Sequence, residues 1–245
     1  MREATLLEDH IAYVRLSDFR ESTTEDLEAA LKQLKDGAMD SLILDLRNNP
    51  GGLLDVSVSV AELFLNRHQL IVTTKGRLRN QNQEMRARMD GVINEIPLVV
   101  LINEGSASAS EIVAGAIQDH RRGIVLGTKS HGKASVQTIF PLKDGSALRL
   151  TTSKYFTPSG RSIHGQGIPP DVEVPLERPP KEKSGEEQTE DVFDRITTDE
   201  KHEKQPKTST AKKRMDNQLA RAVDLLKGIK VYQTKEKVHA LNPVP

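Results

Sequence analysis

The feature that most constrains the fold is a regular alternation of strand-like and helix-like segments through residues 1–176. The expected strands are short apolar runs bounded by turn residues, at 11–16, 41–46, 70–74, 97–102, 124–127, 136–142 and 147–155. The expected helices have apolar residues at helical spacing, between a capping box at Ser22 and Gly37, from 53 to 64, and near 109–119. Such alternation predicts an α/β layered domain whose strands are at least partly parallel.

A different composition begins at residue 177. Residues 177–214 are dominated by charges of both signs, and only Val192, Phe193, Ile196 and Ala211 are apolar. Such a segment cannot bury enough surface to offset its ordering entropy, so we expect a charged linker or mobile insertion. Residues 215–230 are then expected to form an amphipathic helix that stops at Gly228, followed by a tail over 231–245. Because so short a helix is marginal alone, it must dock on the core or on another subunit.

Charge and cysteine content exclude several classes of protein. The 35 Lys and Arg residues balance 35 Asp and Glu residues, which argues against a nucleic-acid partner bound by phosphate neutralisation. The absence of Cys excludes disulfides, zinc-thiolate sites, iron–sulfur clusters and a Cys nucleophile. No apolar run is long enough for a membrane span, and the first residues lack the apolar core of a signal peptide. We expect a soluble fragment, or a chain whose export segment lies outside it.

A serine-rich turn, Gly105–Glu111, joins an expected strand to an expected helix. A serine in such a turn projects over the end of the sheet, close to the N–H groups of a helix N-terminus, where negative charge is stabilised. This environment suits a nucleophile whose intermediate carries an oxyanion. The alternative is that Ser108 and Glu111 form an ordinary capping box.

The second candidate segment contains Lys133 and Gln137, in a turn that leads into a strand. A lysine amine can act as the base for a serine when desolvation keeps it neutral. Gln137 is four residues further on, so both side chains share a face, and a carboxamide oxygen can orient the amine without adding charge. The alternative is an exposed turn lysine beside a solvated glutamine.

Three other interpretations apply to the same region. Residues 127–133 match most of a phosphate-binding loop, but Ala134 replaces the required Ser or Thr and a strand-like run follows. Ser130 and Lys133 have the S-x-x-K spacing of penicillin-binding enzymes, without the partner motifs. A Ser-His-Asp triad would need His120, His131 or His164, and none has an obvious carboxylate partner.

Four segments together resemble the carboxyl-terminal processing proteases, also called tail-specific proteases. They are Asp45–Gly52 (DLRNNPGG), Gly105–Ile112 (GSASASEI), Gly132–Gln137 (GKASVQ) and Arg161–Val172 (RSIHGQGIPPDV), in the order that the family has them. The resemblance implies a ClpP/crotonase-like layered α/β core over residues 1–176, with no metal and no cofactor.

Position by position, the resemblance implies that Ser108 is the nucleophile, Lys133 the general base and Gln137 the residue that orients it. The oxyanion would be bound by the backbone N–H groups of Gly52 and Ala109, and Ser106 and Ser110 would be support residues. Two departures stand out. Ala134 replaces the glycine that usually follows the lysine, and would be strained if that position needs a positive φ. The peptide-binding PDZ domain that usually precedes this core has no counterpart in the chain.

The sequence therefore predicts a serine endopeptidase with a Ser-Lys dyad that cuts proteins near exposed C-terminal tails. Two alternatives stay open: a catalytically inactive core used for assembly, and a nucleotide binder. The resemblance further implies a homo-oligomer, for which the C-terminal helix could serve, an activating adaptor protein, and a periplasmic, cell-envelope or thylakoid-lumen location.

Overall fold

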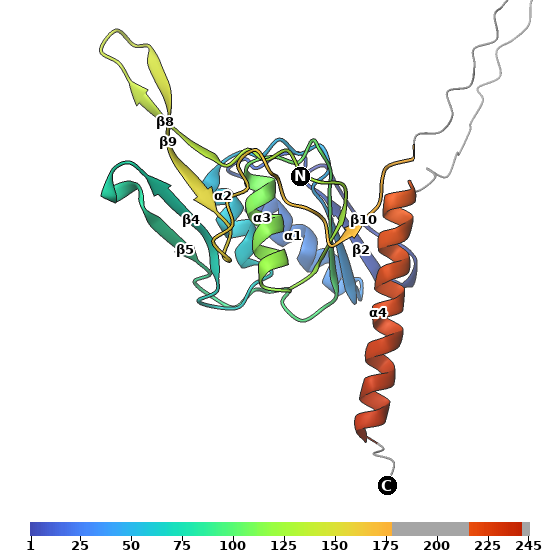
Figure 1. Cartoon of the computed structure of the whole chain (residues 1–245). Helices are drawn as coiled ribbons and strands as arrows, with labels where there is room; N and C mark the ends of the chain where they lie inside the picture. Colours follow the sequence, from blue (N-terminus) through green and yellow to red (C-terminus); the bar gives the residue numbers. More distant parts are fainter. Residues whose placement is uncertain (178–215, 242–245) are drawn as a thin grey trace, which may run out of the picture.

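The computed structural model describes residues 1–177 and 216–241, with side chains through residue 234. Two β-sheets enclose a layer of helices, and a long fourth helix lies on the outer side of the larger sheet (Figure 1). The layered α/β fold predicted from the sequence is therefore confirmed. In the part of the chain that the structure describes, no helix is both long and apolar enough to cross a bilayer.

The larger sheet has six strands in the order β1-β2-β3-β6-β7-β10. The bounds are β1 Glu3–Leu6, β2 Ile11–Arg15, β3 Ser41–Asp45, β6 Leu98–Ile102, β7 Ile124–Gly127 and β10 Val172–Glu173. Only β1 is antiparallel to its neighbour, and every other pairing is parallel. The strands β3 and β6 are buried along their whole length, which explains why residues 42–44 of β3 and all of β6 are continuously apolar instead of alternating.

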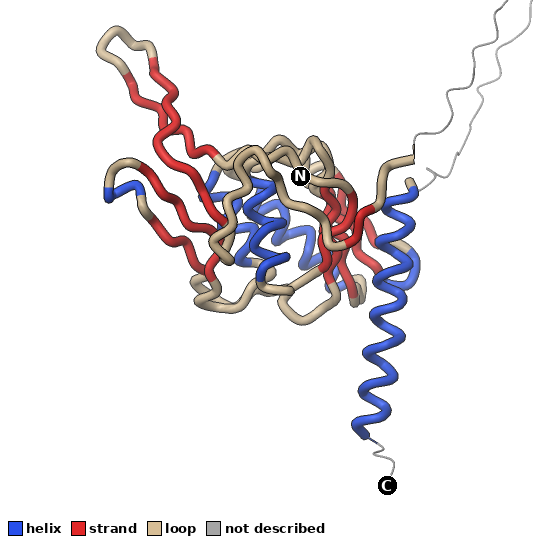
Figure 2. The backbone as a smooth tube through the Cα atoms, in the orientation of Figure 1, coloured by secondary structure: helices blue, strands red, loops and turns tan. Residues whose placement is uncertain are grey.

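The smaller sheet has four antiparallel strands in the order β5-β4-β9-β8. The bounds are β4 Leu70–Gly76, β5 Gln83–Arg86, β8 Ser135–Pro141 and β9 Ala147–Phe156. The hairpin formed by β8 and β9 extends away from the body of the molecule (Figure 2). Its edge strand β8 begins directly after the turn that carries Lys133.

Helices cover both faces of the larger sheet. The helices α1 (Thr23–Asp36), α2 (Leu54–Glu62) and α3 (Ala109–Asp119) pack on one face, and α4 (Asn217–Leu241) packs on the other (Figure 1). Successive residues of each strand alternate between the two sides: Leu42 and Leu44 join the core with α1 to α3, whereas Ile43 packs in the cluster that contains α4. The C-terminal helix thus docks on the core.

Most of the predicted elements are present, with four differences. The strands β1, β5 and β10 were not predicted, because each is short and lacks a strong apolar pattern. The predicted stop at Gly228 is wrong, since α4 continues through it to Leu241, and residues 231–241 are helix instead of tail. Apart from Glu177, the charged segment 177–214 lies outside the described residues, as do residue 215 and residues 242–245.

Three adjacent parallel strands, β3, β6 and β7, end at the same edge of the larger sheet. The turn with the two glycines follows β3, the serine-rich turn follows β6, and the lysine turn follows β7. Because parallel strands have their carboxyl ends on one edge, this topology brings together three motifs that are far apart in the sequence.

Candidate active site

One cleft at this edge contains every residue that the sequence singled out for catalysis. Its volume is about 420 Å³, and its lining includes Ser108, Lys133, Gln137, Gly52 and Ala109. Apolar side chains form most of the remaining wall: Leu53, Leu54, Ile112, Val136 and Ile139. The cleft is therefore a mainly apolar groove with a hydroxyl, an amine and a carboxamide on its surface.

Ser108 occupies a strained position between β6 and α3. Its φ is 56° and its ψ is −113°, a region that a residue with a side chain rarely adopts. A sharp strand-to-helix turn of this kind presents a nucleophile above the end of a sheet. Among the three serines of the turn, only Ser108 lines the cleft, and only Ser108 is not fully buried.

The other two serines hold the turn in place. Ser106 donates to the carbonyl of Leu46 at 2.8 Å, and Ser110 donates to the carbonyl of Asn49 at 2.9 Å. Both serines are completely buried. These contacts tie the serine turn to the turn after β3, as expected for support residues.

The turn after β3 approaches the serine turn so closely that it requires glycine. Gly51 has a φ of 102°, and a Cβ atom there would lie 2.7 Å from the carbonyl oxygen of Ala107 and 2.9 Å from the nitrogen of Ala109. Ala109 is the first residue of α3, so its N–H has no acceptor in a preceding helical turn. Within the described residues, the N–H of Gly52 also has no hydrogen-bond partner. Two residues whose N–H groups have no acceptor in the described part of the chain thus line the cleft beside Ser108.

Lys133 and Gln137 reach the cleft from the lysine turn and from β8. Both side chains are exposed, and neither makes a hydrogen bond or ion pair within the described residues. The desolvation that the sequence argument required of Lys133 is therefore not provided by the described part of the protein alone. The neighbouring Ala134 has no positive φ and is fully buried in the main core, so its methyl group causes none of the anticipated strain.

A buried carboxylate joins the serine turn to the lysine turn. Glu111 is completely buried, and its Oε2 accepts hydrogen bonds from the N–H groups of Ser108 and Lys133, each at 2.9 Å. Its Oε1 accepts from the Ser130 hydroxyl at 2.5 Å and from the Gly132 N–H at 2.7 Å. The sequence suggested only a capping role for Glu111, because the other three donors come from a turn some twenty residues away.

Tyr155 is a further cleft residue that the sequence argument missed. It is buried on β9, and its hydroxyl donates to the carbonyl of Lys133. Burial and the negative charge of Glu111 raise the pKa of Tyr155, although an interaction with the Ser108 side chain lowers it. The phenol is therefore neutral at physiological pH and remains a hydrogen-bond donor.

The segment Arg161–Val172 supports the lysine turn from behind. The N–H of Gly165 donates to the carbonyl of Gly132 at 2.8 Å, and the N–H of Ile168 donates to the Ser130 hydroxyl at 2.7 Å. These contacts explain why the fourth motif of the sequence accompanies the other three, although it contributes no side chain to the cleft lining.

The structure argues against the alternative chemistries. The run after Lys133 is the strand β8, whereas a phosphate-binding loop and an S-x-x-K motif both require a helix there. His120 directly follows α3, and its Nε2 lies 2.6 Å from the carbonyl oxygen of Leu70. Asp119 pairs with Arg161, and none of the three candidate histidines lines the cleft.

Comparison with known proteins shows the family to which the chain belongs. Residues 10–174 match the family model described as peptidase family S41. The chain is 51% identical over 181 residues to a carboxy-terminal-processing protease of Bartonella bacilliformis, an alignment that covers 72% of the chain and 42% of that relative. It is 43% identical over 168 residues to a carboxyl-terminal-processing protease of Synechocystis sp., with 68% and 39% covered.

A solved structure described as the photosystem II D1 C-terminal processing protease superposes with a TM-score of 0.62 at 37% identity. That match covers 67% of the chain and 42% of the solved protein. The chain thus spans about two fifths of the length of the curated relatives it matches.

Proposed function

Because the chain belongs to peptidase family S41, we propose that it is the catalytic core of a carboxyl-terminal processing protease, a serine endopeptidase that cuts proteins near their C-terminal tails. The observation that carries the proposal is the single cleft lined by Ser108, Lys133, Gln137, Gly52 and Ala109. The turns after three adjacent strands supply all of these residues except Gln137, which lies on β8, and the cleft is open and largely apolar, which suits an extended peptide with small or apolar side chains.

In the proposed reaction, the neutral amine of Lys133 takes the hydroxyl proton of Ser108 while Oγ attacks the scissile carbonyl carbon. The N–H groups of Gly52 and Ala109 bind the resulting oxyanion. As the C–N bond breaks, Lys133 gives its proton to the leaving amine, and an acyl ester remains on Ser108. A water molecule then gives a proton to Lys133 and attacks the ester, and the proton returns to Ser108 as the product acid leaves.

The exposure of Lys133 gives the substrate a role in forming the active site. An extended peptide in the cleft covers the amine, excludes water from it and favours its neutral form. The carboxamide oxygen of Gln137 then accepts a hydrogen bond from the amine and directs it towards Ser108. Catalysis of this kind is faster at alkaline pH, because acid protonates the base, and a rate that rose in acid would contradict the assignment.

We also propose that different segments of the chain have different roles. Residues 1–176 form the protease core, and α4 is available for assembly into a homo-oligomer. Partners would be proteins with exposed tails and, as the family resemblance implies, an activating adaptor. The proposed location is the periplasm, the cell envelope or the thylakoid lumen.

The test is degradation of casein in the presence of a metal chelator, with Ser108→Ala and Lys133→Ala as controls. We expect cleavage by the wild-type chain and none by either variant. If all three proteins are folded and none cuts, the core by itself is catalytically inactive and the assembly alternative gains support. Cleavage by folded Ser108→Ala would overturn the assignment of the nucleophile.

A further inference from the structure

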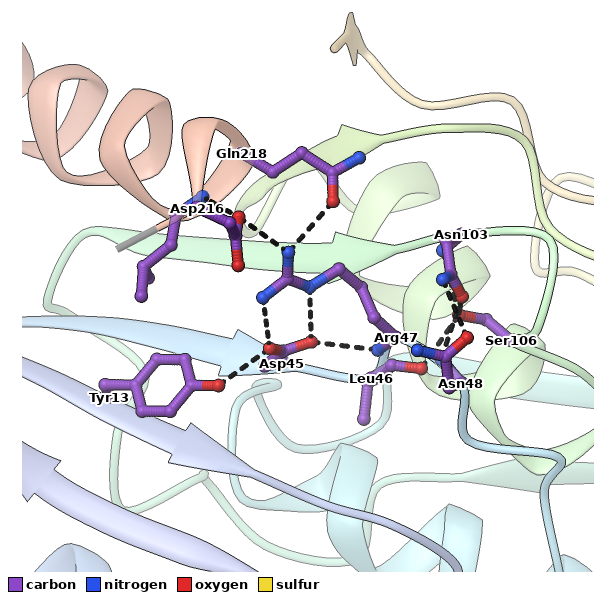
Figure 3. A network of polar contacts seen from close by, with 10 residues as sticks. Tyr13, Asp45, Leu46, Arg47, Asn48, Asn103, Ser106, Asp216 and Gln218 are labelled. Atoms are coloured by element: carbon purple, nitrogen blue, oxygen red, sulfur yellow. Dashed lines mark hydrogen bonds and ion pairs between the residues drawn. The ribbon is translucent and has the colours of Figure 1, made fainter. Parts of the chain in front are cut away.

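A buried ion pair lies at the carboxyl end of β3, directly before the glycine turn (Figure 3). Arg47 binds the carboxylate of Asp45 through two parallel hydrogen bonds, from Nε at 3.0 Å and from a terminal nitrogen at 2.7 Å. The Tyr13 hydroxyl donates to the same carboxylate at 2.8 Å. Since the side chains of Arg47 and Asp45 are 8% and 0% exposed, the guanidinium has little water to complete its hydrogen bonds.

The N-terminus of α4 supplies the missing acceptors. The second terminal nitrogen of Arg47 donates to Asp216 Oδ1 and to Gln218 Oε1, both at 2.9 Å. Asp216 also accepts from the N–H of Leu219 at 2.9 Å, and the Gln218 amide donates to the carbonyl of Val174 at 2.7 Å. Both acceptors are thus held by contacts of their own, and they approach Arg47 in a fixed orientation (Figure 3).

Charge strengthens the contact with Asp216. Burial raises the pKa of that carboxyl group, but the hydrogen bond from Arg47 and further backbone N–H groups outweigh burial, and its pKa lies below the ordinary value. Asp216 is therefore ionised at neutral pH and pairs with a permanent cation.

Arg47 leads directly into the turn that carries Gly52. Its own N–H donates to Asp45 at 2.9 Å, and the next residue, Asn48, has a φ of 57°. The N–H of Asn48 donates to Asn103 Oδ1 at 2.8 Å, and the Asn103 amide donates back to Asn48 Oδ1 at 2.9 Å. The orientation of Arg47 therefore fixes the start of a turn that is also clamped to the loop before Ser108.

We propose that Asp216 and Gln218 are positioning residues of the protease site, acting through Arg47 on the turn that presents the Gly52 N–H to the oxyanion. This inference rests on the proposed function. Without these two acceptors, the guanidinium keeps buried donors with no partner and turns towards water. The turn moves with it, and the donor leaves the position at which it binds the transition state.

The test measures kcat and KM of the full chain for a fluorogenic casein substrate in Asp216→Ala and Gln218→Ala. Lys230→Ala is the matched control, because Lys230 joins the same helix to Asp40 at 2.8 Å, far along α4 from Arg47. We expect both test variants to lower kcat by about tenfold or more with little change in KM, and Lys230→Ala to keep the wild-type kcat. Asp216→Asn retains an oxygen for Arg47 and should recover most of the loss.

The labelling rate of Ser108 by a fluorophosphonate, measured per folded molecule, gives a readout that lower stability alone does not change. Slower labelling in folded Asp216→Ala supports the inference, and so does recovery in Asp216→Asn. Wild-type kcat in Asp216→Ala overturns it, and so does an equal loss in Lys230→Ala. If Gln218→Ala does not fold, the Asp216 variants decide the outcome, because Asp216 is only half-buried and its replacement disturbs the core less. If the folded wild-type chain is as inactive as Ser108→Ala, the proposed function is refuted. If the wild-type chain is active and Ser108→Ala is not, the proposed function stands and the Asp216 variants test this inference alone.

Discussion

The Glu111 carboxylate offers the sharpest test of how the active site is held together. In Glu111→Gln the shape of the side chain is kept, but one oxygen that accepts two hydrogen bonds becomes an NH₂ group. If the NH₂ replaces Oε2, the N–H groups of both Ser108 and Lys133 lose their acceptor. If it replaces Oε1, the Ser130 hydroxyl, which also accepts from the Ile168 N–H, can turn its hydrogen away and accept from the NH₂, and the Gly132 N–H is the one backbone donor left without an acceptor.

The second orientation costs less, so it determines the size of the effect. One buried N–H without an acceptor costs about 1–3 kcal/mol, and the remaining hydrogen bonds lose their charge assistance. We therefore expect the free energy of unfolding to fall by about 2–4 kcal/mol, a large part of the roughly 5–15 kcal/mol of a typical domain. The lysine turn also loses the hydrogen bond that ties Gly132 to Glu111, and kcat should fall by about tenfold or more in the folded protein.

Urea unfolding followed by circular dichroism gives the stability, and casein cleavage by the folded fraction gives the activity. Glu62→Gln is the matched control, since Glu62 is also a buried carboxylate, with hydrogen bonds from Arg88, and does not line the cleft. The control should lose stability and keep its kcat. A Glu111→Gln variant with wild-type stability and wild-type kcat would refute the reasoning.

Three further predictions follow from the same geometry. Gly51→Ala should lower the free energy of unfolding in urea by at least about 2 kcal/mol, because the new methyl group meets a carbonyl oxygen at 2.7 Å. Gly145→Ala is the control, since Gly145 also has a positive φ, of 85°, but has no atom within 4 Å of the added methyl group. The control should show only the smaller cost of backbone strain. Ser108→Gly should be inactive in the casein assay yet more stable than Ser108→Ala by about 1 kcal/mol, since glycine relieves the positive φ; equal stabilities would argue against strain at this position. Burial raises the pKa of Asp119, but hydrogen bonds from its neighbours and the charge of Arg161 outweigh burial and lower the pKa below 3.8. The stabilisation from ionised Asp119 is therefore fully present above pH 3.8 and is lost as the pH falls through the lower pKa of the folded state. Asp119→Asn should lower the free energy of unfolding near neutral pH. As the pH falls into the acid range, the free energy of unfolding should decrease less in this variant than in the wild type.

The sequence by itself determined the main helices and strands and the order of the motifs. Apolar periodicity and capping residues act within a few residues of each other, which is why α1 and β3 were predicted almost to their ends. The same local rule failed at Gly228, since α4 continues through it, and beyond it Lys230 still contacts the core at the carbonyl oxygen of Asp9 and the carboxylate of Asp40.

Only the tertiary structure decided which side chains meet. Parallel pairing of β3, β6 and β7 brings the three turns to one edge, and no local pattern specifies that pairing. The four donors around Glu111 and the contact of Arg47 with Asp216, 169 residues away, arise because a buried charge must find partners wherever the fold places them. The exposure of Lys133 is likewise a property of the assembled cleft, since desolvation depends on the atoms that surround an amine and not on its neighbours in the chain.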